Sequence, residues 1–151
     1  MITIKETTAK ELDNVKALWA DGDVMKFVGF PDGLLQTDDE MKAWLDWIES
    51  ERPQVNHYSI FDGSVYCGET FYSIDSKHGN SASMDIKLFG FARGKGIAAK
   101  ALSYAIEQAL ENGRKRCGWT RTQIMKKRLR FIKGLDLYKS QDRNILQKMK
   151  I

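Results

Sequence analysis

The sequence predicts an α/β fold in which a mixed, mostly antiparallel sheet carries helices on both faces. Three observations predict it: a short strand followed by two amphipathic helices, then three strands joined by short turns, then a long helix directly after the last strand. Short turns join antiparallel neighbours, whereas a long helix after them crosses over the sheet. With 151 residues and 42% hydrophobic residues, the chain can bury one substantial core. We therefore expect a single domain over residues 1–151.

The N-terminal quarter is predicted to form a strand and a first helix. Ile2 and Ile4 alternate with polar residues, as in a short strand. Thr8 and Glu11 have the spacing of a capping box, which marks the start of a helix. An apolar stripe at helical spacing follows, made of Leu12, Val15, Leu18 and Trp19. Gly22 is expected to end this helix.

A second helix is predicted after the loop over residues 31–33. Thr37 and Glu40 repeat the capping signature. The residues expected on the buried face of this helix are Met41, Trp44, Leu45 and Ile48. Large aromatic residues at this spacing are more often part of a core than of a cofactor site, so Trp19 and Trp44 are both expected in the core.

An antiparallel meander is predicted next. Its first strand begins near Val55 and ends at the Asp62-Gly63 dipeptide, a strong hairpin turn. The returning strand covers residues 65–74, residues 76–80 form a second turn, and a third strand covers residues 83–89.

A long helix over residues 96–112 follows, with Asn112 and Gly113 as its expected C-cap. Packing of these elements around one sheet should bury a common set of large side chains. The expected core consists of Trp19, Trp44, Leu45, Ile48, Ile60, Ile86, Leu88 and Leu102.

Composition excludes several classes of protein. Cys67 and Cys117 are the only cysteines, which excludes a disulfide scaffold and a four-cysteine zinc site. His57 and His78 are the only histidines, so we expect no metal centre. No apolar run reaches the roughly 18 residues of a membrane helix, and residues 1–12 lack the apolar stretch of a signal peptide. A cytoplasmic protein without a membrane partner is therefore expected.

The turn between the third meander strand and the long helix is the segment best suited to bind a ligand. Gly94 and Gly96 allow tight backbone turns, so successive N–H groups can converge on an anion. The helix N-terminus, Arg93 and Lys95 add positive charge, and this combination suits a pyrophosphate. The spacing is neither that of a Walker loop nor that of a dinucleotide-binding fingerprint. An ordinary glycine-rich strand-to-helix turn is the alternative.

The pattern Arg93-x-x-Gly96-x-Ala98, preceded by the alternating strand residues Ile86 and Leu88, resembles motif A of the GNAT N-acetyltransferases. The resemblance covers about residues 1–113. It implies that the pyrophosphate of coenzyme A binds to the loop residues Arg93, Gly94, Lys95, Gly96, Ile97 and Ala98. It also implies that backbone groups of Ile86, Lys87 and Leu88 pair with the pantetheine arm. Gly90 departs from the proline that many members have three residues before the arginine.

The resemblance implies transfer of an acetyl group from acetyl-CoA, as co-substrate, to a primary amine of a small molecule or protein, without a metal. In the family a carboxylate or a relayed water removes the amine proton, and backbone N–H groups polarise the thioester carbonyl. Asp85 and Glu69 are the local candidates for the base, although either can be an ordinary solvated strand residue. A tyrosine of the family's second half often protonates the leaving thiolate, but Tyr138 does not fit that pattern. A homodimer is compatible with this interpretation.

The family's second half is not recognisable after residue 113, where the charge also changes. Residues 1–113 carry a net charge of −7, whereas residues 114–151 carry +11. In a shifted reading frame, the third base of each codon becomes the first base of the next codon. In that frame the codons of Trp119-Thr120 must encode Asp, and those of Met125-Lys126 must encode Glu. Synonymous choices then give Trp-Val-Asp-Pro-Asn-Ser-Asp-Asn-Glu-Lys-Ala-Leu-Thr-Leu-Tyr-Lys-Arg-Leu-Gly-Phe, which resembles the missing family segment. We therefore interpret residues 114 to at least 137 as a frame-shifted segment.

Two alternative functions remain open. Residues 114–133 carry nine Lys and Arg side chains and could form a basic arm that binds nucleic acid. Only Trp119 and Phe131 are interleaved as aromatics, which argues against this function. The other alternative is a catalytically impaired protein that still binds coenzyme A.

Overall fold

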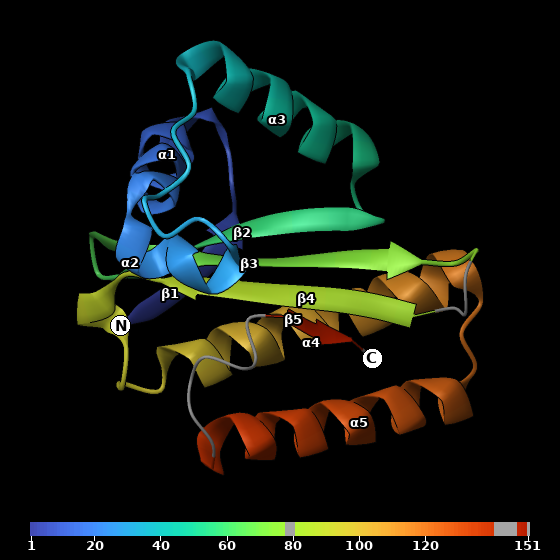
Figure 1. The fold of residues 1–151 in the computed structure, drawn as a ribbon. Helices are drawn as coiled ribbons and strands as arrows, with labels where there is room; N and C mark the ends of the chain where they lie inside the picture. The colour runs from blue at the N-terminus through green and yellow to red at the C-terminus, as the bar shows by residue number, and fades with distance from the viewer. Residues whose placement is uncertain (78–80, 141–147, 151) are drawn as a thin grey trace.

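The computed structural model describes residues 1–77, 81–140 and 148–150 (Figure 1). Residues 78–80 of the predicted second turn lie outside the described residues, as does the side chain of Tyr138. No helix in the described part of the chain is long and apolar enough to span a membrane.

The sheet has five strands in the order β1-β2-β3-β4-β5, and each neighbouring pair is antiparallel. The strands are β1 (Ile2–Glu6), β2 (Val55–Asp62), β3 (Val65–Asp75), β4 (Ser81–Leu88) and β5 (Lys148–Lys150). The predicted first strand and the meander are confirmed, because β2, β3 and β4 follow one another along the chain and in the sheet. The predicted α/β class is confirmed, although no parallel pair occurs among the described strands.

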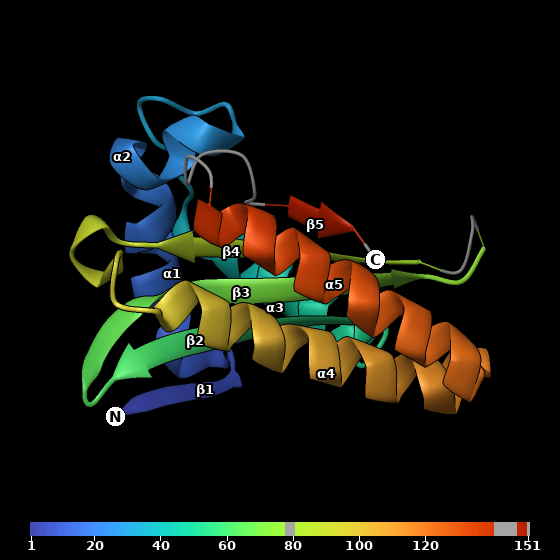
Figure 2. The same ribbon diagram turned by 90° about the horizontal axis from the view of Figure 1, so that it is seen from below.

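Helices cover both faces of the sheet (Figures 1 and 2). One face carries α1 (Leu12–Ala20), α2 (Gly22–Met25) and α3 (Asp38–Glu51). The other carries α4 (Ile97–Cys117) and α5 (Arg121–Ser140), which lie side by side in Figure 2. Both predicted capping boxes form: Thr8 and Glu11 start a 3-10 turn that leads into α1, and Thr37 and Glu40 start α3.

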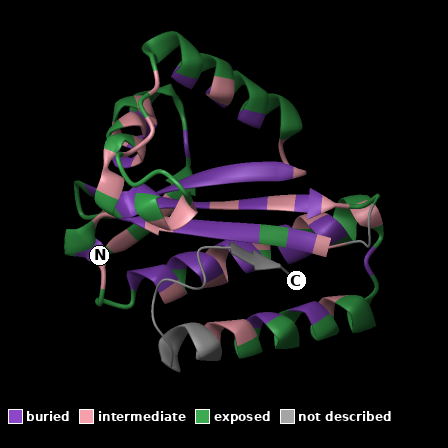
Figure 3. Ribbon diagram, in the orientation of Figure 1, coloured by how far each residue is buried: buried purple, intermediate pink, exposed green. Residues whose placement is uncertain are grey.

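Alternating side chains of the meander point to opposite faces of the sheet, and the even-numbered ones build the main core against α4. Tyr58, Ile60, Tyr72 and Met84 are each at most 2% exposed there. In Figure 3 the strands of the meander are largely in the colour of buried residues. Of the eight residues predicted for the core, six are buried, namely Leu45, Ile48, Ile60, Ile86, Leu88 and Leu102. Trp19 and Trp44 are only partly buried, so the core prediction was wrong for these two side chains.

The predicted end of the long helix at Asn112 and Gly113 is wrong. The helix continues to Cys117, and Gly118 ends it in the left-handed conformation with φ of 65°. Gly113 lies inside the helix, and the Trp119 ring packs on it so closely that an added Cβ would lie 2.3 Å from a ring atom. Asn112 donates a hydrogen bond to the Tyr72 hydroxyl instead of capping the helix.

Residues 118–120 connect α4 to α5. Phe131 of α5 joins the main core, and Lys127 of α5 is also buried. The Lys127 ammonium group lies 4.4 Å from the Trp119 ring centroid. Some of the basic residues pair with acidic residues of α4: Arg128 contacts Glu107, while Arg114 and Lys115 contact Glu111. The outer face exposes the apolar side chains Met125, Leu129 and Ile132 among its basic residues.

The frame-shift hypothesis is tested by peptide mapping of the protein produced from its natural gene. We expect peptides with the shifted sequence Val-Asp-Pro-Asn-Ser-Asp-Asn-Glu in place of residues 118–125. The reason is that the forced Asp and Glu codons reproduce the family pattern without a stop codon. Recovery of peptides that contain Trp119 and Met125 as written would contradict the hypothesis.

Candidate active site

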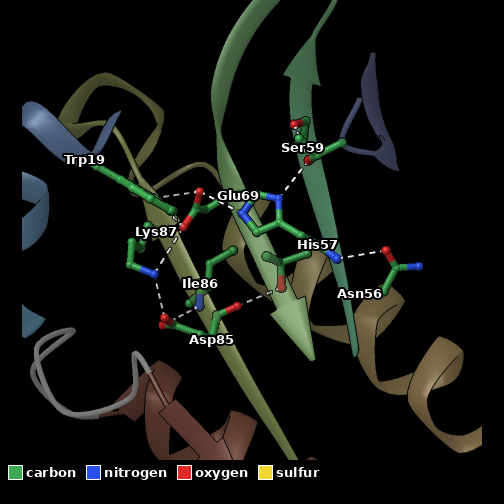
Figure 4. A network of polar contacts seen from close by, with 10 residues as sticks. Trp19, Asn56, His57, Ser59, Glu69, Asp85, Ile86 and Lys87 are labelled. Atoms are coloured by element: carbon green, nitrogen blue, oxygen red, sulfur yellow. Dashed lines mark hydrogen bonds and ion pairs between the residues drawn. The ribbon is translucent and has the colours of Figure 1, made fainter. Parts of the chain in front are cut away.

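Odd-numbered side chains of the meander form a polar strip (Figure 4). The strip lies on the face of the sheet that α1 and α3 cover (Figure 1). His57 comes from β2, Glu69 from β3, and Asp85 and Lys87 from β4. The strand register places Glu69 directly opposite Ser59 on one side and Lys87 on the other. Cross-strand neighbours on one face are within contact distance, so the strip is a connected network.

Glu69 is the centre of this network and is 2% exposed. Its carboxylate accepts hydrogen bonds from Trp19 Nε1 at 3.0 and 3.1 Å, and from Lys87 Nζ at 3.1 Å. It also contacts His57 Nε2 at 2.9 Å, where the ring N–H must donate because an ionised carboxylate only accepts. Burial alone would raise the pKa of Glu69, but Lys87 and His57 outweigh that effect and lower the pKa to about 2. Glu69 is therefore an ionised group with its acceptor sites occupied.

Asp85 differs from Glu69 although both are bound to the same lysine. Its carboxylate accepts from Lys87 Nζ at 2.6 Å and from the Ile86 backbone N–H at 2.8 Å. Burial raises the pKa of Asp85 above its usual value, and the attraction of Lys87 only partly opposes this effect. The two predicted candidate bases thus lie in one site with opposite pKa shifts, an arrangement typical of sites that separate proton-transfer roles.

The network continues behind Glu69 into the protein. His57 Nδ1 lies 2.7 Å from the Thr7 hydroxyl oxygen, which in turn lies 2.7 Å from that of Ser59. Thr7 and Ser59 are fully buried. The hydrogen bonds at both ring nitrogens fix the orientation of the His57 imidazole. The sequence indicated no role for His57, because its partners Thr7 and Glu69 lie 50 and 12 residues away in the chain. Among the described residues, no group of three or more His, Cys, Asp or Glu side chains could hold a metal ion.

A cavity of about 400 Å³ opens over the polar strip. Trp19, Trp44 and Trp47 line it from α1 and α3, whereas Phe71 and the strip residues line it from the sheet. The Trp44 ring packs edge-on against Trp19, with centroids 5.0 Å apart, and against His57 at 4.7 Å. Trp19 and Trp44 are therefore partly exposed because they line a cavity. The helical spacing of the tryptophans could not distinguish a cavity wall from a core.

The predicted anion-binding turn follows β4. Gly94 and Gly96 have φ values of 76° and 77°, which L residues rarely adopt. Ile97 begins α4 without a side-chain cap and without an acidic residue in the first turn. The first backbone N–H groups of a helix have no acceptor within the helix, so they are available to an anion. The exposed side chain of Lys95 adds a positive charge beside them.

Arg93 makes different contacts from those that its charge suggested. Its guanidinium donates to the Leu88 carbonyl oxygen at 3.2 and 3.1 Å, and to the Asp23 carboxylate and carbonyl oxygens at 3.2 Å each. Arg93 therefore joins the end of β4 to α2. These contacts hold the turn in place. Because the Arg93 guanidinium is already bound, the backbone N–H groups and Lys95 are the groups of the turn best able to bind an anion.

The outer edge of β4 lies between the cavity and this turn. The described part of β5 pairs only with Ser83, Met84 and Asp85. The outer edge of the predicted pantetheine-binding residues Ile86, Lys87 and Leu88 therefore has no strand partner among the described residues. At roughly 3.3 Å per residue, this edge extends about 10 Å from Asp85 to Leu88, and residues 89–92 lead from there to the turn.

A family model described as a GNAT acetyltransferase domain matches residues 2–127. The chain belongs to the GNAT acetyltransferase family. The match extends beyond residue 113, where the resemblance drawn from the sequence ended. No curated protein sequence matches the chain at a significant level.

Solved structures of GNAT proteins have the same fold. An acetyltransferase of the GNAT family from Streptococcus pneumoniae is 20% identical, with a TM-score of 0.62 over 75% of this chain and 70% of that one. Spermidine N-acetyltransferase from Vibrio cholerae, in complex with CoA and spermine, is 18% identical, with a TM-score of 0.60 over 73% and 64%. A phosphinothricin acetyltransferase from Sinorhizobium meliloti, in complex with AcCoA, is 18% identical, with a TM-score of 0.57 over 73% and 60%.

Proposed function

We propose that this GNAT protein is an N-acetyltransferase that transfers an acetyl group from acetyl-CoA to a primary amine. The observation that carries the proposal is the order of features along β4. The strand places a buried carboxylate in a cavity at Asp85, then an open edge, then a glycine turn that opens α4. This order provides adjacent places for an amine, an extended thioester arm and a pyrophosphate.

In this proposal the pyrophosphate of acetyl-CoA binds to the turn from Arg93 to Ala98, through its backbone N–H groups and Lys95. The pantetheine arm pairs with the outer edge of Ile86, Lys87 and Leu88. An extended chain with amide groups can add to a strand edge as a further strand would. The thioester then lies close to Asp85, because the open edge begins at the next residue.

The acceptor amine occupies the cavity, releases its ammonium proton to solvent and attacks the thioester carbonyl carbon as the neutral amine. The Asp85 carboxylate accepts the proton that the amine nitrogen then loses, and a backbone N–H group of β4 stabilises the developing oxyanion. The C–S bond breaks, and an amide and the coenzyme A thiolate are formed. Glu69 is a positioning residue, because it holds Lys87, His57 and Trp19 around the base.

The CoA site is tested by replacing Gly96 with valine. We expect CoA affinity, measured by calorimetry, to be lost in Gly96→Val, because a β-branched residue disfavours the left-handed backbone of the turn. Gly63→Val is the matched control: Gly63 also has positive φ and open space around it, but it lies in the β2–β3 hairpin. Unchanged affinity in Gly96→Val, with the fold intact by circular dichroism, would overturn the site assignment.

A further inference from the structure

The titratable side chains that line the cavity are bound to one another: His57 and Lys87 both contact Glu69, and Lys87 also contacts Asp85. The floor of the cavity, on the sheet, contains the Glu69 and Asp85 carboxylates, and Lys87 is the one Lys or Arg side chain among the described residues that line the cavity. The Lys87 ammonium already binds both carboxylates, at 3.1 and 2.6 Å. Each described cationic donor of the cavity is thus engaged by the protein, and an additional anion would find no free counter-charge there.

The walls of the cavity are aromatic on the side away from this floor. Trp44 and Trp19 meet edge to face, and Trp47 lies on the same helix as Trp44 and is 48% exposed at the rim. Flat apolar walls stabilise an apolar or aromatic stem by removing its surface from water. Indole faces also attract cations. The tryptophans therefore favour an apolar or aromatic stem, and the carboxylates of the floor favour a cationic group at its end.

We propose that the acceptor is a cationic amine on an aromatic or apolar stem, and that the cavity discriminates against amines carrying a carboxylate. This inference rests on the proposed acetyl transfer and specifies its acceptor. The ammonium group lies toward Asp85, whereas the stem packs against the tryptophan side chains that line the cavity. A carboxylate next to the amine, as in an α-amino acid, would face Asp85 and Glu69 and be repelled.

Binding can be measured without acetyl-CoA, because three of the chain's four tryptophans line the cavity and report on ligands by fluorescence. We expect 2-phenylethylamine to change tryptophan emission saturably. Phenylalanine, which differs by one carboxylate, is expected to bind at least about ten-fold more weakly, because like charges close together are unfavourable. 3-Phenylpropanoate, which lacks the amine, is expected not to bind. Equal binding of phenylalanine and 2-phenylethylamine would overturn the proposal.

Variants assign the effect to the cavity. We expect Asp85→Asn and Trp44→Leu each to weaken 2-phenylethylamine binding about ten-fold in calorimetry, through loss of a charged partner or an aromatic wall. Asp46→Asn removes an exposed carboxylate on the same helix as Trp44 and should leave affinity unchanged. Unchanged affinity in Asp85→Asn would overturn the proposal.

These measurements are independent of catalysis. Selective amine binding without CoA binding would uphold the cavity's selectivity but overturn the proposed acetyl transfer. CoA binding with no preference among the three probes would overturn this inference and leave the proposed function standing.

Discussion

Asp85→Asn is expected to lower kcat for acetylation of 2-phenylethylamine about 10²- to 10⁴-fold, the usual range for loss of a general base. The amide cannot accept the amine proton, whereas the buried carboxylate, with its raised pKa, is a better base than an exposed aspartate. CoA affinity should not change, because the turn after β4 is untouched. The measurement is steady-state kinetics with calorimetry of CoA binding.

The dependence of kcat on pH, on the acidic side of its maximum, distinguishes loss of a catalytic base from a general disturbance of the site structure. In the unmodified protein kcat should fall as the pH falls through the pKa of Asp85, because the protonated carboxyl cannot accept a proton. Asp85→Asn should lack this decrease, and Asp46→Asn should keep it. A rate in Asp85→Asn within a few-fold of the unmodified protein would exclude Asp85 as the base.

Glu69→Gln is expected to lower the free energy of unfolding by about 3 kcal/mol, because breaking a buried ion pair on one side leaves its partners uncompensated. Trp19, His57 and Lys87 all donate to this carboxylate. Denaturant unfolding measures the change. Glu49→Gln, a neutralised exposed glutamate on α3, is the matched control and should have little effect. A change below about 0.5 kcal/mol, as for ordinary surface substitutions, would contradict the central role of Glu69.

The stability difference between the unmodified protein and Glu69→Gln should depend on pH in a defined direction. The folded pKa of Glu69 is about 2, below its ordinary value of 4.5. Its stabilising contribution is therefore fully present above pH 4.5 and is lost as the pH falls toward 2. The difference in unfolding free energy between the unmodified protein and Glu69→Gln should narrow over this interval. A difference that stays constant would mean that the Glu69 pKa is not lowered.

Local signals predicted much of the fold. Both capping boxes form where the Thr and Glu spacing placed them, and the Asp62-Gly63 turn joins β2 and β3. These features depend on a few neighbouring residues and on strand alternation, so they can be recognised without knowledge of tertiary contacts. The end of α4 was mispredicted because Gly113 resembles a C-cap locally, whereas it lies inside the helix with the Trp119 ring packed on it.

The candidate site was predictable only in part, because it is assembled from distant segments. The sequence singled out Asp85 and Glu69 but did not indicate their different surroundings. Glu69 is bound by Trp19, which lies 50 residues away in the sequence. Arg93 likewise appeared to be a free cation, yet its partner Asp23 lies 70 residues away. Residue types and spacing do not specify such pairings, which follow from the register of the sheet and the placement of α1 and α2 on it.

The central claim is that this chain joins a coenzyme A site to an amine cavity and transfers an acetyl group between them. The most direct test incubates the unmodified protein with acetyl-CoA and 2-phenylethylamine and measures free thiol together with the N-acetylated amine by mass spectrometry. We predict amide formation with one thiol released per amide, and none above background in Gly96→Val. Saturable binding of both ligands without amide formation would contradict the claim and identify a non-catalytic CoA-binding protein.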